Sequence, residues 1–276
     1  MTTLSKIYER CDEVEERLDF PAGGQAVVLS ARSPDKESAN EDSAAIIDAG
    51  NGAIVLAVAD GLGGQPGGDQ ASAIAVRELR NCVHAARKEP TSVREAILDG
   101  FDRANRAIIG QGNGSATTLV VVEVDERHAR SYHVGDSGLL VCGGRGKIKL
   151  ETIAHSPVGY AVEAGILSAK EAIQHEDRHI VSNVVGDPSM HVGMSSPLRL
   201  RPRDTVVLAS DGLFDNFHAW EIVEFVRRGS LSDGVHTLAS RCRERMTRPS
   251  DTRPSKPDDL TIVAFRRPRT ASKASS

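Results

Sequence analysis

The chain has 276 residues, enough for one large domain, and its 39% hydrophobic content can supply a sizeable core. Its 34 basic and 38 acidic residues are interspersed and leave a net charge of -4, which excludes the strong positive field typical of nucleic-acid and membrane-surface binders. Four widely spaced cysteines form no metal or disulfide motif, and no apolar run is long enough to span a bilayer, so we expect a cytoplasmic protein that binds neither nucleic acid nor membrane.

The first twenty residues are predicted to form an amphipathic helix. Apolar residues recur there at steps of three and four, with charged residues between them, at Leu4, Ile7, Cys11, Val14 and Leu18. Pro21 ends this pattern. Residues 21–267 contain no linker or internal repeat and are expected to form one domain, whereas the small, polar and basic residues 268–276 are typical of a disordered tail.

Alternating and continuous β-branched runs predict nine strands, at Gln25–Arg32, Ser43–Asp48, Ala53–Ala59, Ala116–Val124, Ala129–Gly135, Gly138–Cys142, Ile148–Ile153, Asp204–Ser210 and Leu260–Phe265. Helical periodicity predicts helices at Gly68–Ala86, from Ser92 onward, at Ala219–Arg228 and at Leu231–Arg245. Ser92 and Glu95 have the spacing of a capping box. Because strands and helices do not alternate as βαβ units would, the order favours an α+β fold of antiparallel sheets with helices outside.

Acidic residues recur at the ends of these predicted strands. Asp60, Asp136 and Asp211 each follow a strand and are followed by a glycine or a Ser-Gly turn. Two acidic stretches instead precede a strand, at Asn40-Glu41-Asp42 and at Asp258-Asp259. In an antiparallel sheet the end of one strand lies beside the start of its neighbour. All five acidic turns can therefore meet at one edge of the structure.

Carboxylates that converge in this way repel each other unless a cation lies among them. No His or Cys stands at ligand spacing, so oxygen ligands are expected, which suit Mg²⁺ or Mn²⁺. Two such ions, about 3.5–4 Å apart, can activate a water molecule and hold a phosphate through its oxygens. The glycines Gly61, Gly63 and Gly64 would let the backbone approach an ion closely. This pattern predicts hydrolysis of a phosphate ester.

The motifs together resemble those of the metal-dependent protein phosphatases, the protein phosphatase 2C-like serine/threonine phosphatases. Seven stretches occur in that family's order between about residues 25 and 265: NED, VADGLGG, ATTL, HVGDSG, EAGILSAKEAIQHEDRHIVSNVVGD, LASDGLFD and DDLTIV. The resemblance implies a central antiparallel β-sandwich flanked by helices on both sides, in α-β-β-α layers. It also implies that a water activated between two Mn²⁺ or Mg²⁺ ions attacks phosphoserine or phosphothreonine directly, without a phosphoenzyme.

The resemblance assigns roles to particular residues. Asp60 would bridge the two ions, and the Gly61 carbonyl would bind one of them. Asp211 and Asp259 would complete the shell of the second ion. Glu41 and Asp42 would hold metal-bound water from outside, and Asp136 would join Asp211 around the third, weaker ion that some relatives bind. Residues 163–187 match the family's flap, which lies beside the active site and touches substrate, and Ser168 and Glu171 within it form a second capping box.

The sequence departs from the family pattern at the phosphate-binding position. Many relatives have an arginine where this chain has Glu37, and Lys36 or Arg32 is the candidate substitute for it. A lysine lacks the bidentate fork of an arginine, so weak phosphate affinity is expected. Leu62 stands where some relatives have a histidine proposed as a general acid.

Three further residues depart from the family pattern without removing a metal ligand, namely Gln65, Gly138 and Ala154. Three histidines are interpreted as hydrogen-bonded structural residues, namely His155, His175 and His179. The aromatic residues near the third predicted helix are interpreted as core, namely Phe214, Phe217, Trp220 and Phe225.

Two alternatives to a protein phosphatase stay open at this point. One is a catalytically degenerate binding or regulatory module, suggested by Glu37 and Gly138. The other is a hydrolase of small phosphate monoesters that uses the same site. For the main hypothesis the expected partners are a phosphorylated protein substrate and, by analogy, a cognate Ser/Thr kinase, and a monomer is expected.

Overall fold

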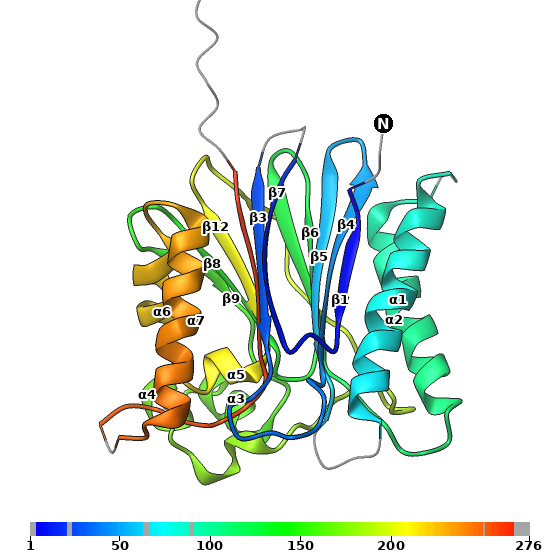
Figure 1. Cartoon of the computed structure of the whole chain (residues 1–276). Helices are drawn as coiled ribbons and strands as arrows, with labels where there is room; N and C mark the ends of the chain where they lie inside the picture. Colours follow the sequence, from blue (N-terminus) through cyan, green and yellow to red (C-terminus); the bar gives the residue numbers. More distant parts are fainter. Residues whose placement is uncertain (1–3, 21–23, 63–66, 89–90, 251, 268–276) are drawn as a thin grey trace, which may run out of the picture.

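Two antiparallel sheets pack face to face, and helices cover the outer face of each (Figure 1). This arrangement confirms the expected α-β-β-α layers. The computed structural model describes residues 4–20, 24–62, 67–88, 91–250 and 252–267. The predicted tail at 268–276 and the residues Gly63, Gly64 and Gln65 lie outside the described part of the chain.

The described strands form one sheet of seven strands and one of six. The larger sheet runs in the order β1 (Lys6–Glu9), β4 (Asp42–Gly50), β5 (Ala53–Asp60), β6 (Leu119–Val124), β7 (His128–Val134) and β10 (Gly193–Met194), and β11 (Leu198–Arg199) also pairs with β7. The smaller sheet runs in the order β2 (Glu13–Asp19), β3 (Gln25–Ala31), β13 (Leu260–Arg266), β12 (Thr205–Ala209), β8 (Gly138–Cys142) and β9 (Ile148–Glu151). All nine strands predicted from the sequence are present.

Helices on each side complete the hydrophobic core. The larger sheet is covered by α1 (Gly68–Ala86) and α2 (Val93–Ile109), and the smaller by α6 (Ala219–Val226) and α7 (Leu231–Thr247). A third group of buried residues, with Leu56 and Val263 among its members, fills the space between the sheets. Ser92 caps α2 by accepting a hydrogen bond from Glu95 N, while the Glu95 carboxylate accepts one from Ser92 N, as the sequence predicted.

The predicted N-terminal helix is wrong, because this segment forms the strands β1 and β2. Arg10 has a φ of 52°, a left-handed conformation that turns the chain between them. Pairing with β4 satisfies the backbone of β1, and pairing with β3 satisfies that of β2. Each becomes an edge strand, where the charged side chains of this segment can remain in solvent. This tertiary pairing outweighs the helical spacing of the five apolar residues.

The strand ends bring the acidic turns to one end of the sandwich, the lower end in Figure 1. Asp42 at the start of β4 is the direct partner of Asp60 at the end of β5. In the other sheet, the last residue of β12, Ala209, pairs with Gly138 of β8 and with Ile262 near the start of β13. The short helices α3 (Pro157–Glu163), α4 (Ala169–Ala172) and α5 (Asp211–Phe214) lie at the same end, with a 3₁₀ turn, η1 (Glu176–His179), in the chain after α4. No helix in the described residues is both long and apolar enough to cross a membrane.

Candidate active site

Six aspartates from both sheets form an acid centre at this end of the sandwich, and we use that name for Asp42, Asp60, Asp136, Asp211, Asp215 and Asp258. The charges of four of them, Asp42, Asp211, Asp258 and Asp136, act on Asp60. Asp215 joins the group because its carboxylate interacts with that of Asp211 from the other end of α5. The convergence predicted from strand ends is thus present in the folded chain.

Burial and mutual repulsion raise the pKa values of these carboxyl groups. For Asp60, burial is the larger cause, and the charges of Asp42 and Asp211 add to it. The same two effects raise the pKa of Asp136 to about 8 and those of Asp215 and Asp258 to about 6. Carboxylates in this environment favour any cation that can enter among them.

Three buried carboxylate oxygens in the acid centre accept no hydrogen bond, namely Asp42 Oδ1, Asp211 Oδ1 and Asp215 Oδ2. Asp215 Oδ2 still forms an ion pair with Lys256, whereas the other two oxygens are free. Unsatisfied buried acceptors are rare in folded proteins, and free carboxylate oxygens are the ligands that Mg²⁺ and Mn²⁺ prefer. Within the described residues, no three Asp, Glu, His or Cys side chains make a metal-binding group by themselves. The residues therefore fit hard divalent ions whose remaining ligands are carbonyl and water oxygens.

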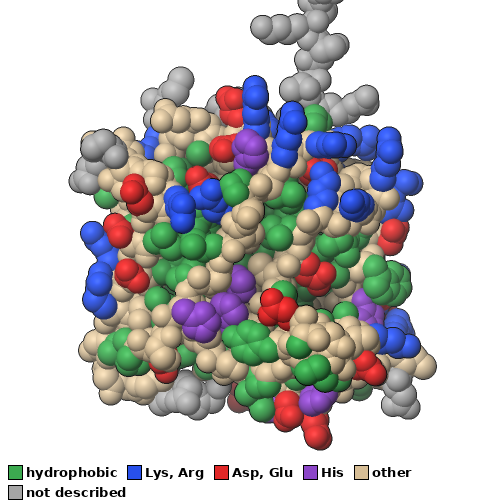
Figure 2. All heavy atoms as spheres, turned by 180° about the vertical axis from the view of Figure 1, so that it is seen from behind, with side chains coloured by type: hydrophobic (Ala, Val, Ile, Leu, Met, Phe, Trp, Pro, Cys, Tyr) green, Lys and Arg blue, Asp and Glu red, His purple; other side chains and the backbone are tan. Residues whose placement is uncertain are grey.

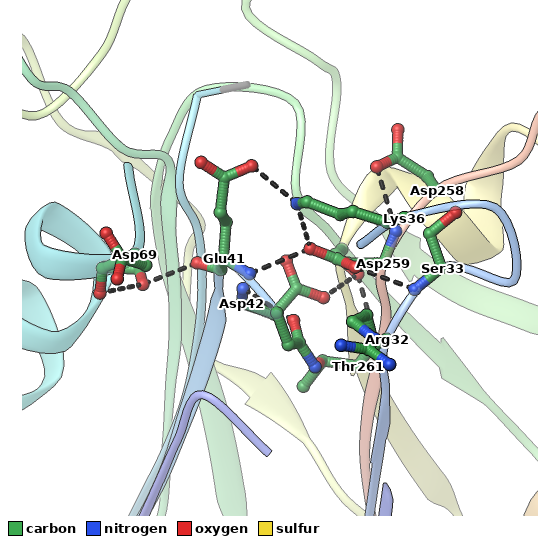
Figure 3. A network of polar contacts seen from close by, with 12 residues as sticks. Arg32, Ser33, Lys36, Glu41, Asp42, Asp69, Asp258, Asp259 and Thr261 are labelled. Carbon is green, nitrogen blue, oxygen red and sulfur yellow. Dashed lines mark hydrogen bonds and ion pairs between the residues drawn. The ribbon is translucent and has the colours of Figure 1, made fainter. Parts of the chain in front are cut away.

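Two lysines neutralise carboxylates here: Lys256 within the acid centre, and Lys36 beside it. Lys36 Nζ lies 2.5 Å from Glu41 Oε2 and 2.6 Å from Asp259 Oδ2, in the network shown in Figure 3. Lys256 Nζ lies 2.5 Å from Asp211 Oδ2, and Asp215 and Asp258 are its other partners. Burial alone would lower the pKa of each lysine, but the surrounding carboxylates outweigh it and raise both values.

The two acids of the DDLTIV stretch face different surroundings. Asp259 accepts hydrogen bonds from Ser33 N and Glu41 N, both at 2.8 Å, and pairs with Lys36 (Figure 3). Asp258 instead shares Lys256 with Asp211. The structure therefore places Asp258 beside Asp211, in the position that is predicted from the sequence for Asp259. Neighbouring residues in extended backbone point to opposite sides, so Asp258 faces Asp211, while the charge of Asp259 acts on Asp42.

The remaining residues expected at the site lie around the acid centre. Glu41 holds Lys36 through its side chain and accepts a hydrogen bond from Gly61 N through its carbonyl. Gly61 packs tightly, since a Cβ there would lie 2.2 Å from the Gly68 carbonyl oxygen. Arg32 forms an ion pair with Asp12, which is not part of the acid centre; Arg32 Nη1 lies 3.6 Å from Asp12 Oδ1.

Sequence reasoning missed two cations at the centre. Lys256 is one of them, and its position two residues before Asp258 was the available signal. The other is Arg178 in the flap, whose Nε lies 3.8 Å from Asp215 Oδ2. Arg178 also donates hydrogen bonds to the carbonyls of Ile173 and Ser255, which fixes the flap against the segment before β13.

A cavity of about 820 Å³ adjoins the acid centre. Its walls come from β8, β9, α3, α4 and α6, and are largely apolar, while Asp136, Asp211 and Asp215 lie at its acidic side. Trp220 borders this cavity and is 64% exposed, so the interpretation of Trp220 as core is wrong. The buried face of α6 is formed by Ile222, Val223 and Val226, and Trp220 in the first turn lies off that face. Phe217 is buried, and Phe214 and Phe225 pack against the same core as predicted.

Comparison with protein families matches residues 32–247 to protein phosphatase 2C. The chain belongs to the protein phosphatase 2C family. A 2C-type protein phosphatase from Streptococcus pyogenes is 32% identical over 195 residues, which cover 68% of this chain and 78% of that protein. The structure of Stp1 from Staphylococcus aureus has a TM-score of 0.76 and 24% identity, covering 87% of this chain and 94% of that one. The catalytic domain of the phosphatase PstP, in complex with two manganese ions, has a TM-score of 0.71 and 22% identity, covering 88% and 98%.

These matches confirm the family and the fold that the seven motifs indicated. The protein phosphatase 2C match starts at Arg32 and includes the acid centre except Asp258. Two predictions for the flap are confirmed, namely the capping box of Ser168 and Glu171 and the structural role of His175. Ser168 and Glu171 form the capping box that begins α4, and His175 caps η1 by accepting a hydrogen bond from Asp177 N.

Histidines group beside acidic and hydrophobic side chains on the lower half of the rear face, whereas Lys and Arg gather mainly over the upper half (Figure 2). His155 stacks on His133 with ring centroids 4.3 Å apart, and its Nδ1 lies 2.8 Å from Asn183 Nδ2. The His155 backbone N–H donates to the carbonyl of Gly135, next to Asp136. His155 is therefore a buried structural residue, as predicted from the sequence.

Acid should destabilise the fold through His155. Burial, with the nearby His133 and His191, lowers the pKa of His155 from 6.5 to about 4. Between these values the unfolded chain binds a proton that the folded chain does not. This contribution to stability is complete above pH 6.5 and is lost as the pH falls to about 4. From pH 7 to pH 5, the free energy of unfolding measured in urea should fall less for His155→Gln than for the native chain. An equal fall in both proteins would contradict this assignment.

Proposed function

We propose that this chain hydrolyses phosphoserine and phosphothreonine on proteins with the help of two Mn²⁺ or Mg²⁺ ions. The observation that carries the proposal is the acid centre, in which buried carboxylates with unpartnered oxygens converge at the end of the sandwich. The two manganese ions in PstP, which shares the fold, support the choice of cation. Phosphoprotein substrates are supported by relatives such as the protein phosphatase PhpP of Streptococcus pneumoniae, which is 30% identical over 194 residues.

We assign the ligand roles to Asp60, Asp211 and Asp258, with the Gly61 carbonyl, and give Asp136 to a third, weaker ion. Asp258 replaces Asp259 in this set because Asp258 shares a cation with Asp211. When bound, the ions would lower the pKa of a water molecule and hold the phosphate oxygens. Glu41 and Asp42 lie beside these ligands, and Asp42 Oδ1 is free to accept a hydrogen bond from water.

Other side chains of this chain would position the substrate. Asp259 fixes the loop from Ser33 to Glu41 through two backbone hydrogen bonds, and so holds Glu41 in place. Arg178 is a guanidinium at the edge of the acid centre and is better suited than Arg32 to contact a phosphate. Lys36 is engaged by two carboxylates and would have to release them to reach a phosphate. We propose a cytoplasmic monomer, and the four free cysteines are consistent with a reducing compartment.

Phosphate release from a phosphothreonine peptide tests the proposed function. We expect release with Mn²⁺ or Mg²⁺, and none with a chelator, because the carboxylates need the cation to act on the phosphate. Asp211→Asn should remove the activity and leave the circular dichroism spectrum unchanged. The absence of release at any metal concentration from folded protein would contradict the proposal and favour a binding module. Release from p-nitrophenyl phosphate but not from phosphopeptides would instead indicate a small-molecule hydrolase.

A further inference from the structure

Lys256 occupies a central position among carboxylates that come from different parts of the chain. Its Nζ lies 2.5 Å from Asp211 Oδ2, 2.9 Å from Asp215 Oδ2 and 3.1 Å from Asp258 Oδ2. Asp211 begins α5 and Asp215 directly follows it, after β12, whereas Asp258 precedes β13, the neighbour of β12 in the smaller sheet. The Lys256 side chain is only 23% exposed, so the ammonium group is largely screened from water. One monovalent cation therefore links three carboxylates.

This cation position coincides with the one that a divalent ion would need. Asp258 Oδ1 accepts a hydrogen bond from Asp259 N, so an ion bound by both carboxylates would draw on Asp258 Oδ2. The Lys256 ammonium already holds that oxygen together with Asp211 Oδ2. Two positive charges this close repel each other strongly in a partly buried site. Asp215 would keep a counter-charge if Lys256 moved, because Arg178 Nε also lies 3.8 Å from its Oδ2. The surroundings thus allow the lysine to leave.

Lys36 differs from Lys256 in this respect. It neutralises Glu41 and Asp259, and Asp259 is also held by hydrogen bonds from Ser33 N and Glu41 N. Lys36 can stay in place while ions occupy the acid centre. Of the two lysines, only Lys256 contacts two of the residues to which we assign ligand roles.

We propose that Lys256 is a built-in competitor for one divalent ion, which must be displaced from Asp211 and Asp258 before that ion binds. The proposal rests on the proposed function, since it concerns the same carboxylates. It makes Lys256 a residue that sets how much Mn²⁺ or Mg²⁺ the enzyme needs. The competition keeps the centre neutralised while the metal is absent, and it weakens the affinity of one ion.

Titration of the metal-free chain with Mn²⁺ in a calorimeter tests this proposal without measuring activity. In Lys256→Gln, the affinity of one Mn²⁺ ion should rise by about 10-fold, within the usual range for coupled binding equilibria. Lys256→Arg keeps a cation and should bind Mn²⁺ as the native chain does. The matched control is Lys149→Gln, because Lys149 pairs with Asp204 before β12, at the opposite end of that strand from Asp211, and is 19% exposed. It should leave the Mn²⁺ affinity unchanged.

Thermal unfolding provides a second readout. Both glutamine variants should melt at a lower temperature than the native chain without metal, since each loses an ion pair. Saturating Mn²⁺ should stabilise Lys256→Gln more than Lys149→Gln. Equal or weaker Mn²⁺ binding in Lys256→Gln would overturn the role of Lys256 and leave the proposed function standing. Failure of the native chain and of every variant to bind Mn²⁺ would overturn both.

Discussion

Asp60→Asn should abolish most phosphate release and at the same time make the metal-free chain more stable. Loss of a carboxylate to which we assign a metal-ligand role is expected to lower turnover by roughly 10²- to 10³-fold, as removal of one preorganised electrostatic contact does. The stabilisation follows from the raised pKa of Asp60, which burial and the charges of Asp42 and Asp211 cause. A neutral side chain relieves that repulsion, and each kcal/mol gained raises the melting temperature by about 2–4 °C.

Melting curves with and without Mn²⁺, beside the phosphopeptide assay, check both halves of this expectation. The native chain should gain stability from the ion, by about 2.7 kcal/mol at 100 times its Kd, whereas Asp60→Asn should gain much less. Asp48→Asn is the control, because Asp48 lies near the far end of the same β4–β5 ladder and pairs with Arg87 there. If Asp60→Asn lowers the metal-free melting temperature, the repulsion among the carboxylates has been misjudged.

Gly212→Ala should remove activity through a backbone displacement. A Cβ at Gly212 would lie 2.0 Å from the Asp259 carbonyl oxygen, so the start of α5 must move away from the start of β13. Overpacking of this kind lowers the free energy of unfolding by about 1–3 kcal/mol. The larger effect falls on catalysis, because Asp211 would separate from Asp258, and a displacement of about 1 Å in an active site can lower the rate 10²-fold.

Phosphopeptide turnover and urea unfolding measure the two effects of Gly212→Ala separately. Gly144→Ala is the matched control, because the atoms nearest to a Cβ there are 3.8 Å away, an ordinary contact distance. It should change neither quantity. Full activity in Gly212→Ala would show that the distance between α5 and β13 does not matter for the reaction.

The parts of this fold that the sequence predicted well are those with a strong local signal. The apolar runs that became β5 and β12 lead into an acid followed by a glycine. Antiparallel pairing of β5 with β4 and of β12 with β13 brought those acids to one end of the sandwich, as expected. The α1 helix matches its predicted bounds because its apolar face repeats over five turns. Such segments have one favourable way to bury their apolar surface.

Other features depended on contacts that no local pattern contains. The choice between Asp258 and Asp259 required knowing which face of the chain before β13 points to the acid centre, and a shift of one residue reverses it. The N-terminal segment has helical spacing, yet two free sheet edges were available to pair with it. Lys256 was overlooked because its three partners, though one lies only two residues away, meet it only in the folded chain.

The N-terminal segment has a consequence for how the two sheets unfold. β1 completes the edge of one sheet on β4, and β2, after a turn at Arg10, completes the edge of the other on β3. One short stretch of chain thereby closes both layers, so that neither sheet can lose its outer strand without straining the other. The N-terminal segment thereby couples the two layers into one cooperative unit. The edge that β2 leaves free carries exposed charged side chains, which disfavour pairing with strands of other molecules.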